Sequence, residues 1–493
     1  MTSRRRCSEV PRRVGVAVAA IMAVGATASF AADTRITPRI SVFQWYSDNI
    51  DQEQNSQKRS DFITAVSPGI RMDSDGARVR FSLDYDLDVI RYWKEEDNDR
   101  TSNRLFHIGT AELWRELLFV DTRASISQER TSSSGGESPN DQAFTTNRTE
   151  VRTYSISPYL RNHFGDFADS ELRYTFGQTY YSENDFSDAT TNRVTGQLVS
   201  GPQFLRTLWT VYLDAGDVDR SSDSPTTTNS EDISWRTAEL RTQYLVNSSF
   251  SGLVNFGYER FEDPTLLEEP NGLIWAVGFR YTPSARTTVD ALYNHRFDEY
   301  YPSIFITHEI GPATIVRASY TEGLQTAGAS FQQNLTFLEV DEFGNYVDRR
   351  TAQLFRAGNN NFGITNDSAR FKRFNATLSS VRDRNTYGLN AFYDERFTDT
   401  SGIEETAVGG AINYGRQISV NTRMGATARY REQDLGTPDG RKDDYYNLGL
   451  NLAYQMSEQL RMVASYNFVR RDSNIDAFDY TENIVGVGLI KTF

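Results

Sequence analysis

Charged side chains recur at every second position in several segments of this chain, and their spacing is the first clue to its chemistry. Between residues 77 and 89 the odd positions are apolar or aromatic, whereas the even positions include two arginines and three aspartates. Guanidinium groups pair with carboxylates through two parallel hydrogen bonds, and arginines that line a pore attract anions. This chemistry suits a water-filled interior better than a catalytic cleft.

We assign a set of such charged positions to one inner surface. An unpaired arginine or lysine that faces lipid costs roughly 2–4 kcal/mol at mid-depth, which is enough to decide which face of a strand points inward. Two interpretations remain open: a stripe of arginines near residues 423–431 guides an acidic polysaccharide, or the arginines pair with nearby acids across strands. The second is favoured. The inward candidates are Arg78, Arg80, Asp84, Asp86, Asp88, Arg173, Arg206, Asp214, Glu239, Arg241, Arg280, Asp290, Arg423, Arg429 and Arg431.

The histidines offer the strongest case for catalysis, and it is weak. His295 and His308 are expected near an extracellular mouth, with Asp298 and Glu299 close by, so a proton-transfer pair is one interpretation. The preferred interpretation is that these histidines are polar groups at the membrane interface. No histidine has metal-ligand spacing, and residues 73–76 predict a tight turn rather than a calcium loop because the downstream glutamate is missing. We expect neither an enzyme nor a cofactor.

Charge and cysteine content exclude further classes. The one cysteine, Cys7, precedes an apolar run of residues 14–28 that predicts a secretory signal with cleavage after Ala31. Removal of residues 1–31 takes the net charge from −14 to −18. So acidic a chain is a poor candidate for binding nucleic acid. The mature chain has no thiol for a disulfide or a nucleophile.

The elements that hold the charged positions are predicted to be long strands. Alternating segments of about ten residues recur along the chain, long enough to cross a bilayer when tilted and longer than the usual five or six residues of soluble strands. Aromatic residues gather near segment ends, as expected of interfacial girdles; examples are Trp45-Tyr46, Tyr92-Trp93, Tyr180-Tyr181 and Tyr300-Tyr301.

The connections between the segments alternate between short and long, which is typical of outer-membrane barrels. Eleven such hairpins predict an all-β, transmembrane, antiparallel up-and-down barrel of about 22 strands, within a range of 18 to 24, over residues 32–493. Few residues precede the first strand at about Ile36, so we expect no plug domain. The long connection 325–369 is expected either to fold inward as a constriction, to cap the extracellular mouth, or to remain an exposed loop. The chain ends on Phe493, which is typical of the last strand of such barrels and serves as a signal for their assembly.

Both ends of the mature chain resemble a known family. ITPRISVFQWYSDNI at residues 36–50 and FITAVSPGIR at 62–71 resemble the first two strands of outer-membrane barrels associated with the PEP-CTERM/exosortase system. RDSN at 471–474 and YTEN at 480–483 resemble the final hairpin of that family. Similar phrases also occur in alginate-exporter-like barrels.

The resemblance implies a function in moving or anchoring a surface polysaccharide, because members are generally encoded with exopolysaccharide machinery. It carries no catalytic or binding residues. We therefore expect an outer-membrane conduit or docking component for exopolysaccharide export. The expected partners are outer-membrane lipids, the barrel-assembly machinery, exopolysaccharide and periplasmic export components. The alternatives are a small-solute porin and a structural barrel that scaffolds a surface matrix.

Overall fold

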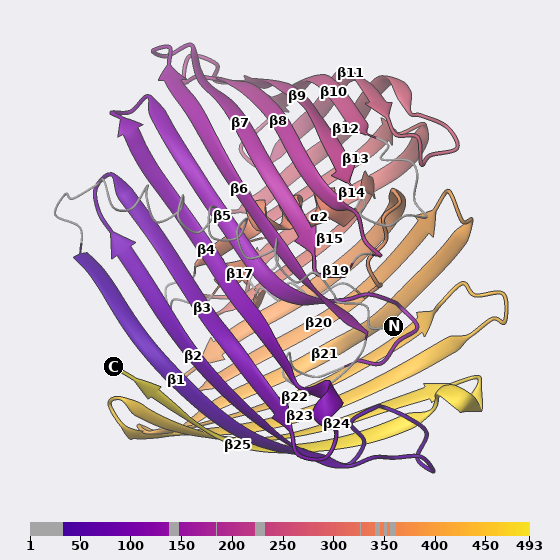
Figure 1. Ribbon diagram of the computed structural model, residues 1–493. Coiled ribbons are helices and arrows are strands. Elements are labelled where there is room, and N and C mark those ends of the chain that lie inside the picture. Colours follow the sequence, from indigo (N-terminus) through magenta and orange to yellow (C-terminus); the bar gives the residue numbers. More distant parts are fainter. Residues whose placement is uncertain are drawn as a thin grey trace, which may run out of the picture.

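The chain forms a closed barrel of 22 antiparallel strands (Figure 1). The computed structural model describes residues 33–137, 147–183, 185–221, 232–325, 327–340, 346–349, 353–354 and 361–493. Each strand of the barrel pairs with the next barrel strand along the chain, and β1 pairs with β25 to close the ring. The predicted signal segment 1–31 lies outside the described residues. In the part of the chain that the structure describes, no helix is long and apolar enough to cross a membrane.

The strands of the barrel are long, with most spanning 13 to 16 residues. The first half comprises β1 (Asp33–Ser47), β2 (Asp61–Asp75), β3 (Val79–Tyr92), β4 (Arg100–Trp114), β5 (Leu118–Arg130), β6 (Arg148–His163), β7 (Ala168–Tyr181), β8 (Asp188–Ser200), β9 (Thr207–Ser221), β10 (Ile233–Leu245) and β11 (Phe250–Glu262). The second half comprises β12 (Asn271–Ser284), β13 (Thr287–Arg296), β14 (Glu299–Glu309), β15 (Thr314–Gln325), β19 (Ala369–Arg382), β20 (Asn385–Thr398), β21 (Ile403–Ser419), β22 (Thr422–Asp434), β23 (Lys442–Ser457), β24 (Leu460–Ser473) and β25 (Tyr480–Thr492).

The alternation in the sequence becomes the two faces of the barrel. On β23 the outward Leu448, Leu450 and Leu452 are all exposed, as lipid-facing side chains must be in the isolated chain. Tyrosines flank this apolar band: Tyr446 contacts Tyr430 above it, and Tyr454 lies below it. Eight residues separate Tyr446 from Tyr454, or about 27 Å along the strand and about 21 Å along the membrane normal at a tilt of about 40°. This matches the apolar band of an outer-membrane barrel, about 25 Å tall.

The connections confirm the predicted alternation of short and long. Those at one end are short, such as residues 285–286, 383–384 and 458–459, whereas those at the other end include 48–60, 131–147 and 326–368. By the usual orientation of these barrels the short turns are periplasmic. One extracellular connection has just two residues: Phe297 and Asp298 both have φ near +58° and close β13 onto β14 as a tight turn.

This turn corrects one expectation. His295 lies beside it, near the extracellular mouth, but His308 pairs with Thr287 at the periplasmic end of the hairpin. The expectation that both histidines sit at one mouth was wrong, because the tight turn at residues 297–298 looked from sequence like part of a continuous segment.

The chain between β15 and β19 folds into the barrel. It carries α2 (Ala327–Phe337) and a small sheet of β16 (Leu338–Val340), β17 (Tyr346–Asp348) and β18 (Gln353–Leu354). Figure 1 shows α2 and β17 within the ring of strands. Of the three placements considered for the connection 325–369, the described part of this segment occupies the inward one.

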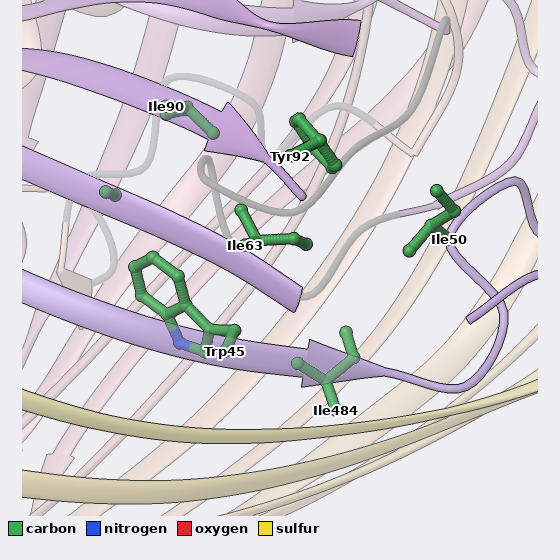
Figure 2. Packing of buried hydrophobic residues seen from close by; sticks show 7 residues of the cluster. Trp45, Ile50, Ile63, Ile90, Tyr92 and Ile484 are labelled. Carbon is green, nitrogen blue, oxygen red and sulfur yellow. The ribbon is translucent and has the colours of Figure 1, made fainter. Parts of the chain in front are cut away.

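A hydrophobic cluster covers part of the inner wall near the extracellular end (Figure 2). The rings of Phe43 and Trp45 stack at 5.0 Å and nearly parallel. They lie flat against the inner face of β25, where a Cβ at Gly486 or Gly488 would collide with them. The cluster, completed by Ile50, Ile63, Ala65, Ile90, Tyr92 and Ile484, fixes the first extracellular loop onto the wall.

Candidate functional site: a constricted lumen

The predicted acidic residues of β3 do face inward, where they join a network across four strands. The Arg39 guanidinium of β1 donates to both Asp84 and Asp86, and Arg104 of β4 also binds Asp86. Asp88 accepts from the Ser67 hydroxyl. Because each carboxylate has a partner on another strand, these aspartates brace the wall and leave little free negative charge for a solute.

A second charged region lies on the inner face of β7 to β13, and we call it the charged wall. Each of its arginines forms a salt bridge with a carboxylate, so positive and negative charges alternate closely over the wall. The pairs are Arg173–Glu171 at 2.9 Å, Arg193–Asp214 at 2.7 Å, Arg241–Glu239 at 2.7 Å, Arg280–Asp290 at 2.7 Å and Arg296–Glu259. Six of the predicted lumen residues are found here, paired as the mixed-charge interpretation requires.

Two predicted arginines lie elsewhere. Arg78 falls in the short turn between β2 and β3, and Arg206 falls in the turn before β9, so neither is on the inner wall. Arg80, at the periplasmic end of β3, is largely exposed and lies 3.3 Å from Asp75. The final Phe493 follows β25, with its backbone N–H bound to the Pro38 carbonyl.

The histidines form no catalytic arrangement with the acids named above. His295 stacks between Trp275 and Tyr300 in the outer aromatic girdle, and its Nδ1 lies 3.1 Å from the Leu273 carbonyl. Glu299 binds Arg370 at 2.8 Å instead. Across the described ranges, no group of three or more histidine, cysteine, aspartate or glutamate side chains could hold a metal ion.

The extracellular half of the lumen is crossed by residues 131–137 of the β5–β6 connection, which we call the strap. Its backbone carbonyls accept from arginines on the far wall: Arg441 binds Ser134 O at 3.1 Å, and Arg471 binds the same oxygen at 3.4 Å. Gln52 of the first loop donates to Glu137 O. The strap therefore starts at β5 and is held against the β22–β23 loop, β24 and the β1–β2 loop.

A buried ion cluster fastens the end of the strap. The Glu137 carboxylate binds both Arg130 at the end of β5 and Arg431 of β22. Burial opposes ionisation of Glu137, but the guanidinium groups of Arg431 and Arg130 outweigh it and lower the pKa of Glu137 to about 2. Arg431 is only 3% exposed and stacks over Tyr445. Glu137 thus links two walls that are far apart in the barrel.

Residues 361–368, the last part of the β15–β19 connection, lie against the strap and complete the constriction. Gly363 N donates to the Ser133 hydroxyl at 2.8 Å, and Ile364 N donates to the Arg130 carbonyl at 3.1 Å. Asn366 bridges the β7–β8 loop and β9, accepting from Ser187 N and from Arg220. We call the strap and residues 361–368 together the constriction.

Helix α2 descends from the constriction along the inner face of β5 to β8. Arg123 donates to the carbonyls of Leu335 and Leu338 at 2.9 and 2.7 Å, which satisfies the end of the helix. Gln332 donates to the Gln178 carbonyl at 3.0 Å. Tyr346 of β17 packs on Phe106 and lies 3.0 Å from the Ser82 hydroxyl. We call α2 and the sheet of β16 to β18 the insertion. The insertion lines one side of the lumen, whereas the opposite side is lined by the barrel strands themselves.

That opposite side carries a feature that sequence analysis missed. On β20 to β24, two adjacent rows of inward residues contain glycine, asparagine, threonine and serine and no charge. We call this the amide band. Its ten positions are Thr386, Gly388, Asn413, Gly415, Gly425, Thr427, Gly449, Asn451, Ser465 and Asn467.

Glycines make the amide band flat. A Cβ at Gly425 would collide with Asn451 Oδ1, and one at Gly449 would lie 3.1 Å from Asn467 Oδ1. The asparagine side chains therefore lie over the neighbouring glycines instead of standing into the lumen. Thr427 donates to Asn413 Oδ1 at 3.0 Å. The signal for this band is present in the alternating residues of each strand, but only the register aligns the five strands.

The predicted basic stripe sits around the amide band and is mostly engaged. Arg431 holds Glu137, and Arg429 lies 3.4 Å from Asn361 Oδ1 and over the Phe392 ring. Arg423, below the band, is exposed and donates to Gln417 at 3.1 Å. Two of the three arginines therefore contact the constriction or its supports, and one faces the periplasmic opening.

Comparison with known proteins gives the class of the fold. Residues 385–493 match the model of a family described as "Putative beta-barrel porin 2". The FrpB iron transporter of Neisseria meningitidis in its apoprotein form is 10% identical, with 93% of this chain and 81% of that chain covered and a TM-score of 0.53. The siderophore receptor PirA of Acinetobacter baumannii is 9% identical, with 92% and 80% covered and a TM-score of 0.51. No curated protein sequence matches the chain.

The identities with the solved structures are low enough that they show the fold alone. With the porin-family match and the two girdles, they identify the chain as an outer-membrane β-barrel. The matched residues span β20 to β25 and so contain the amide band.

Proposed function

We propose that this protein is a gated outer-membrane conduit for exopolysaccharide. The observation that carries the proposal is the way in which the constriction is held. Apart from the backbone bond between Ile364 N and the Arg130 carbonyl, the strap and residues 361–368 contact the walls through side chains and not through the strand ladder. They can therefore move without opening the barrel. A barrel of 22 strands encloses a wider lumen than a barrel of about eight strands, whose interior is filled by side chains.

The resemblance of both chain ends to barrels of the PEP-CTERM/exosortase system supports a polymer as the cargo. In this proposal the polymer is driven from the inner membrane, and the barrel supplies a polar path and a gate. Periplasmic export components would dock at the short turns, and the barrel-assembly machinery would read the C-terminal strand with Phe493.

A small-solute porin is the second candidate, and the porin-family match over residues 385–493 favours it. One pair of measurements separates the two. The gene is deleted and surface polysaccharide is measured, while the purified full-length barrel is tested for single-channel conductance. Lost polysaccharide with low basal conductance supports the gated conduit. Unchanged polysaccharide with a steady open conductance identifies a porin, and unchanged polysaccharide without conductance points to a structural scaffold.

A further inference from the structure

The amide band is an uncharged part of the lumen that is open to a solute. Its inward Asn413 and Asn451 are exposed, although both lie on the inner face of a closed barrel. Among the described residues, the side-chain amides of Asn451 and Asn467 make no hydrogen bond to the protein. The strap and residues 361–368 lie above this band, and α2 and β17 pack against β3 to β8 on the other side of the lumen.

The depth of the amide band places it within the membrane span. On the outer face at the same rows, Leu389, Ile412, Leu448 and Leu450 form part of the apolar surface. The band therefore lies between the constriction above and the exposed Arg423 and Arg461 below. Any solute that crosses the barrel along β20 to β24 has to pass over it.

We infer that the amide band is a binding track for an uncharged, hydroxyl-rich glycan, which names the cargo of the conduit and rests on the proposed function. Amide and hydroxyl side chains both donate and accept hydrogen bonds, as sugar hydroxyls do. An acidic glycan would instead select free guanidinium groups. The two rows of the band contain none, and the arginines above them are engaged: Arg431 with Glu137, and Arg429 with Asn361 and Phe392.

The flatness of the band suits a moving polymer. Each hydrogen bond to an exposed amide contributes only about 0.5–1.5 kcal/mol net, and neighbouring amides offer the next contact at once. Because glycines lower the asparagines onto the wall, no large side chain stands in the path. The track therefore binds weakly and repeatedly, as transport requires.

The test is equilibrium binding to the full-length protein in a detergent that has no sugar headgroup. The probes are a short linear neutral gluco-oligosaccharide and a galacturonate oligomer of equal length, titrated by calorimetry. We expect the neutral probe to bind and the double variant Asn413→Ala/Asn451→Ala to weaken it about tenfold. The matched control is Asn255→Ala, which removes an inward amide from β11 of the charged wall and should leave binding unchanged.

Circular dichroism checks that each variant keeps its strands. If the double variant fails to fold, Thr427→Val removes one hydroxyl at constant volume and should weaken the neutral probe about threefold. Tighter binding of the galacturonate oligomer, or equal binding by the band variants and the wild type, would overturn the inference.

These outcomes are separable from those of the proposed function. If neutral oligosaccharide binds at the band but the gene deletion leaves surface polysaccharide intact, the track stands and the export role fails. If export is lost and the purified barrel prefers the acidic probe, the export role stands and the track fails.

Discussion

The charged wall and the amide band face each other across one lumen, but their side chains differ in charge and in how they lie on the sheet. On the charged wall, β7 to β13, arginines and carboxylates pair within one strand or between neighbouring strands. On the amide band, β20 to β24, glycines draw short uncharged side chains down onto the sheet. Paired charges stiffen a wall and hold water tightly, whereas flat amides present exchangeable hydrogen bonds. The difference assigns support to one side and passage to the other.

The largest expected effect comes from the ion cluster that fastens the strap. Glu137→Ala removes the shared partner of Arg130 and Arg431 and leaves two buried guanidinium groups unpaired. Loss of one partner from a buried pair costs about 3–5 kcal/mol, so the strap should leave the far wall. Single-channel conductance in planar bilayers should rise severalfold.

The control for that variant lies on the charged wall. Glu239→Ala also removes the partner of a lumen arginine, but Arg241 is 46% exposed and sits two residues away on the same strand. An exposed pair contributes about 0.2–1 kcal/mol, so conductance should stay near the wild-type value. Equal conductance in both variants and in the wild type would mean that the strap is no barrier.

A second prediction sharpens the contrast between glycines on the two sides. At Gly278 of β12 an added Cβ would run into the Ala291 carbonyl, a backbone atom that cannot yield. At Gly425 the obstacle is the side chain of Asn451, which can swing away. Gly278→Ala should therefore lower the unfolding free energy by about 1–3 kcal/mol, as read from denaturant melts of the barrel.

The Gly425→Ala variant should have an unfolding free energy close to that of the wild type. It should lose affinity for the neutral oligosaccharide, because the displaced Asn451 side chain would project into the lumen. Two equally destabilised variants would contradict the view that the amide-band glycines shape the surface and not the backbone.

Acid should loosen the strap reversibly. The pKa of Glu137 is lowered to about 2 from an ordinary 4.5, by Arg431 and Arg130 against the effect of burial. A depressed carboxylate pKa gives stability that is complete above the unfolded value and is lost as pH falls towards the folded value. Between pH 4.5 and 3.5 the loss is about 1 kcal/mol. Conductance should be constant from pH 8 to about 5 and should rise below about 4, whereas in Glu137→Ala it should lack this rise.

The fold was predictable because one rule governs every strand of the barrel. Lipid accepts apolar side chains and rejects charges, so a period of two is enough to define the faces and the 22 strands. The two-residue turn at Phe297 and Asp298 escaped prediction, since it is much shorter than most of the other extracellular connections and contains no glycine or proline.

The sequence predicted the inward direction of most of the charged candidates but not their partners, because the ion pairs depend on strand register and on loop positions. Alternation placed Asp84 and Asp86 inward, but their shared partner Arg39 lies 45 and 47 residues away in the chain. The contact of Glu137 with Arg431 crosses the lumen and has no local signature. The amide band was hidden for the same reason, since each strand contributes only two of its ten positions.

The smallest expected effect concerns the arginine that remains free of the constriction. Arg423 is exposed below the amide band, and among the residues that the structure describes its guanidinium binds Gln417 alone. Because an exposed charge in a hydrated opening is screened within about 10 Å at 0.1 M salt, Arg423→Gln should lower the anion-to-cation permeability ratio less than twofold, and only at low salt. Binding of the neutral oligosaccharide should not change, since the arginine lies outside the two uncharged rows. A large drop in that binding would extend the track downward to the periplasmic rim and would make charge part of its recognition, which would erase the contrast between the two sides of the lumen.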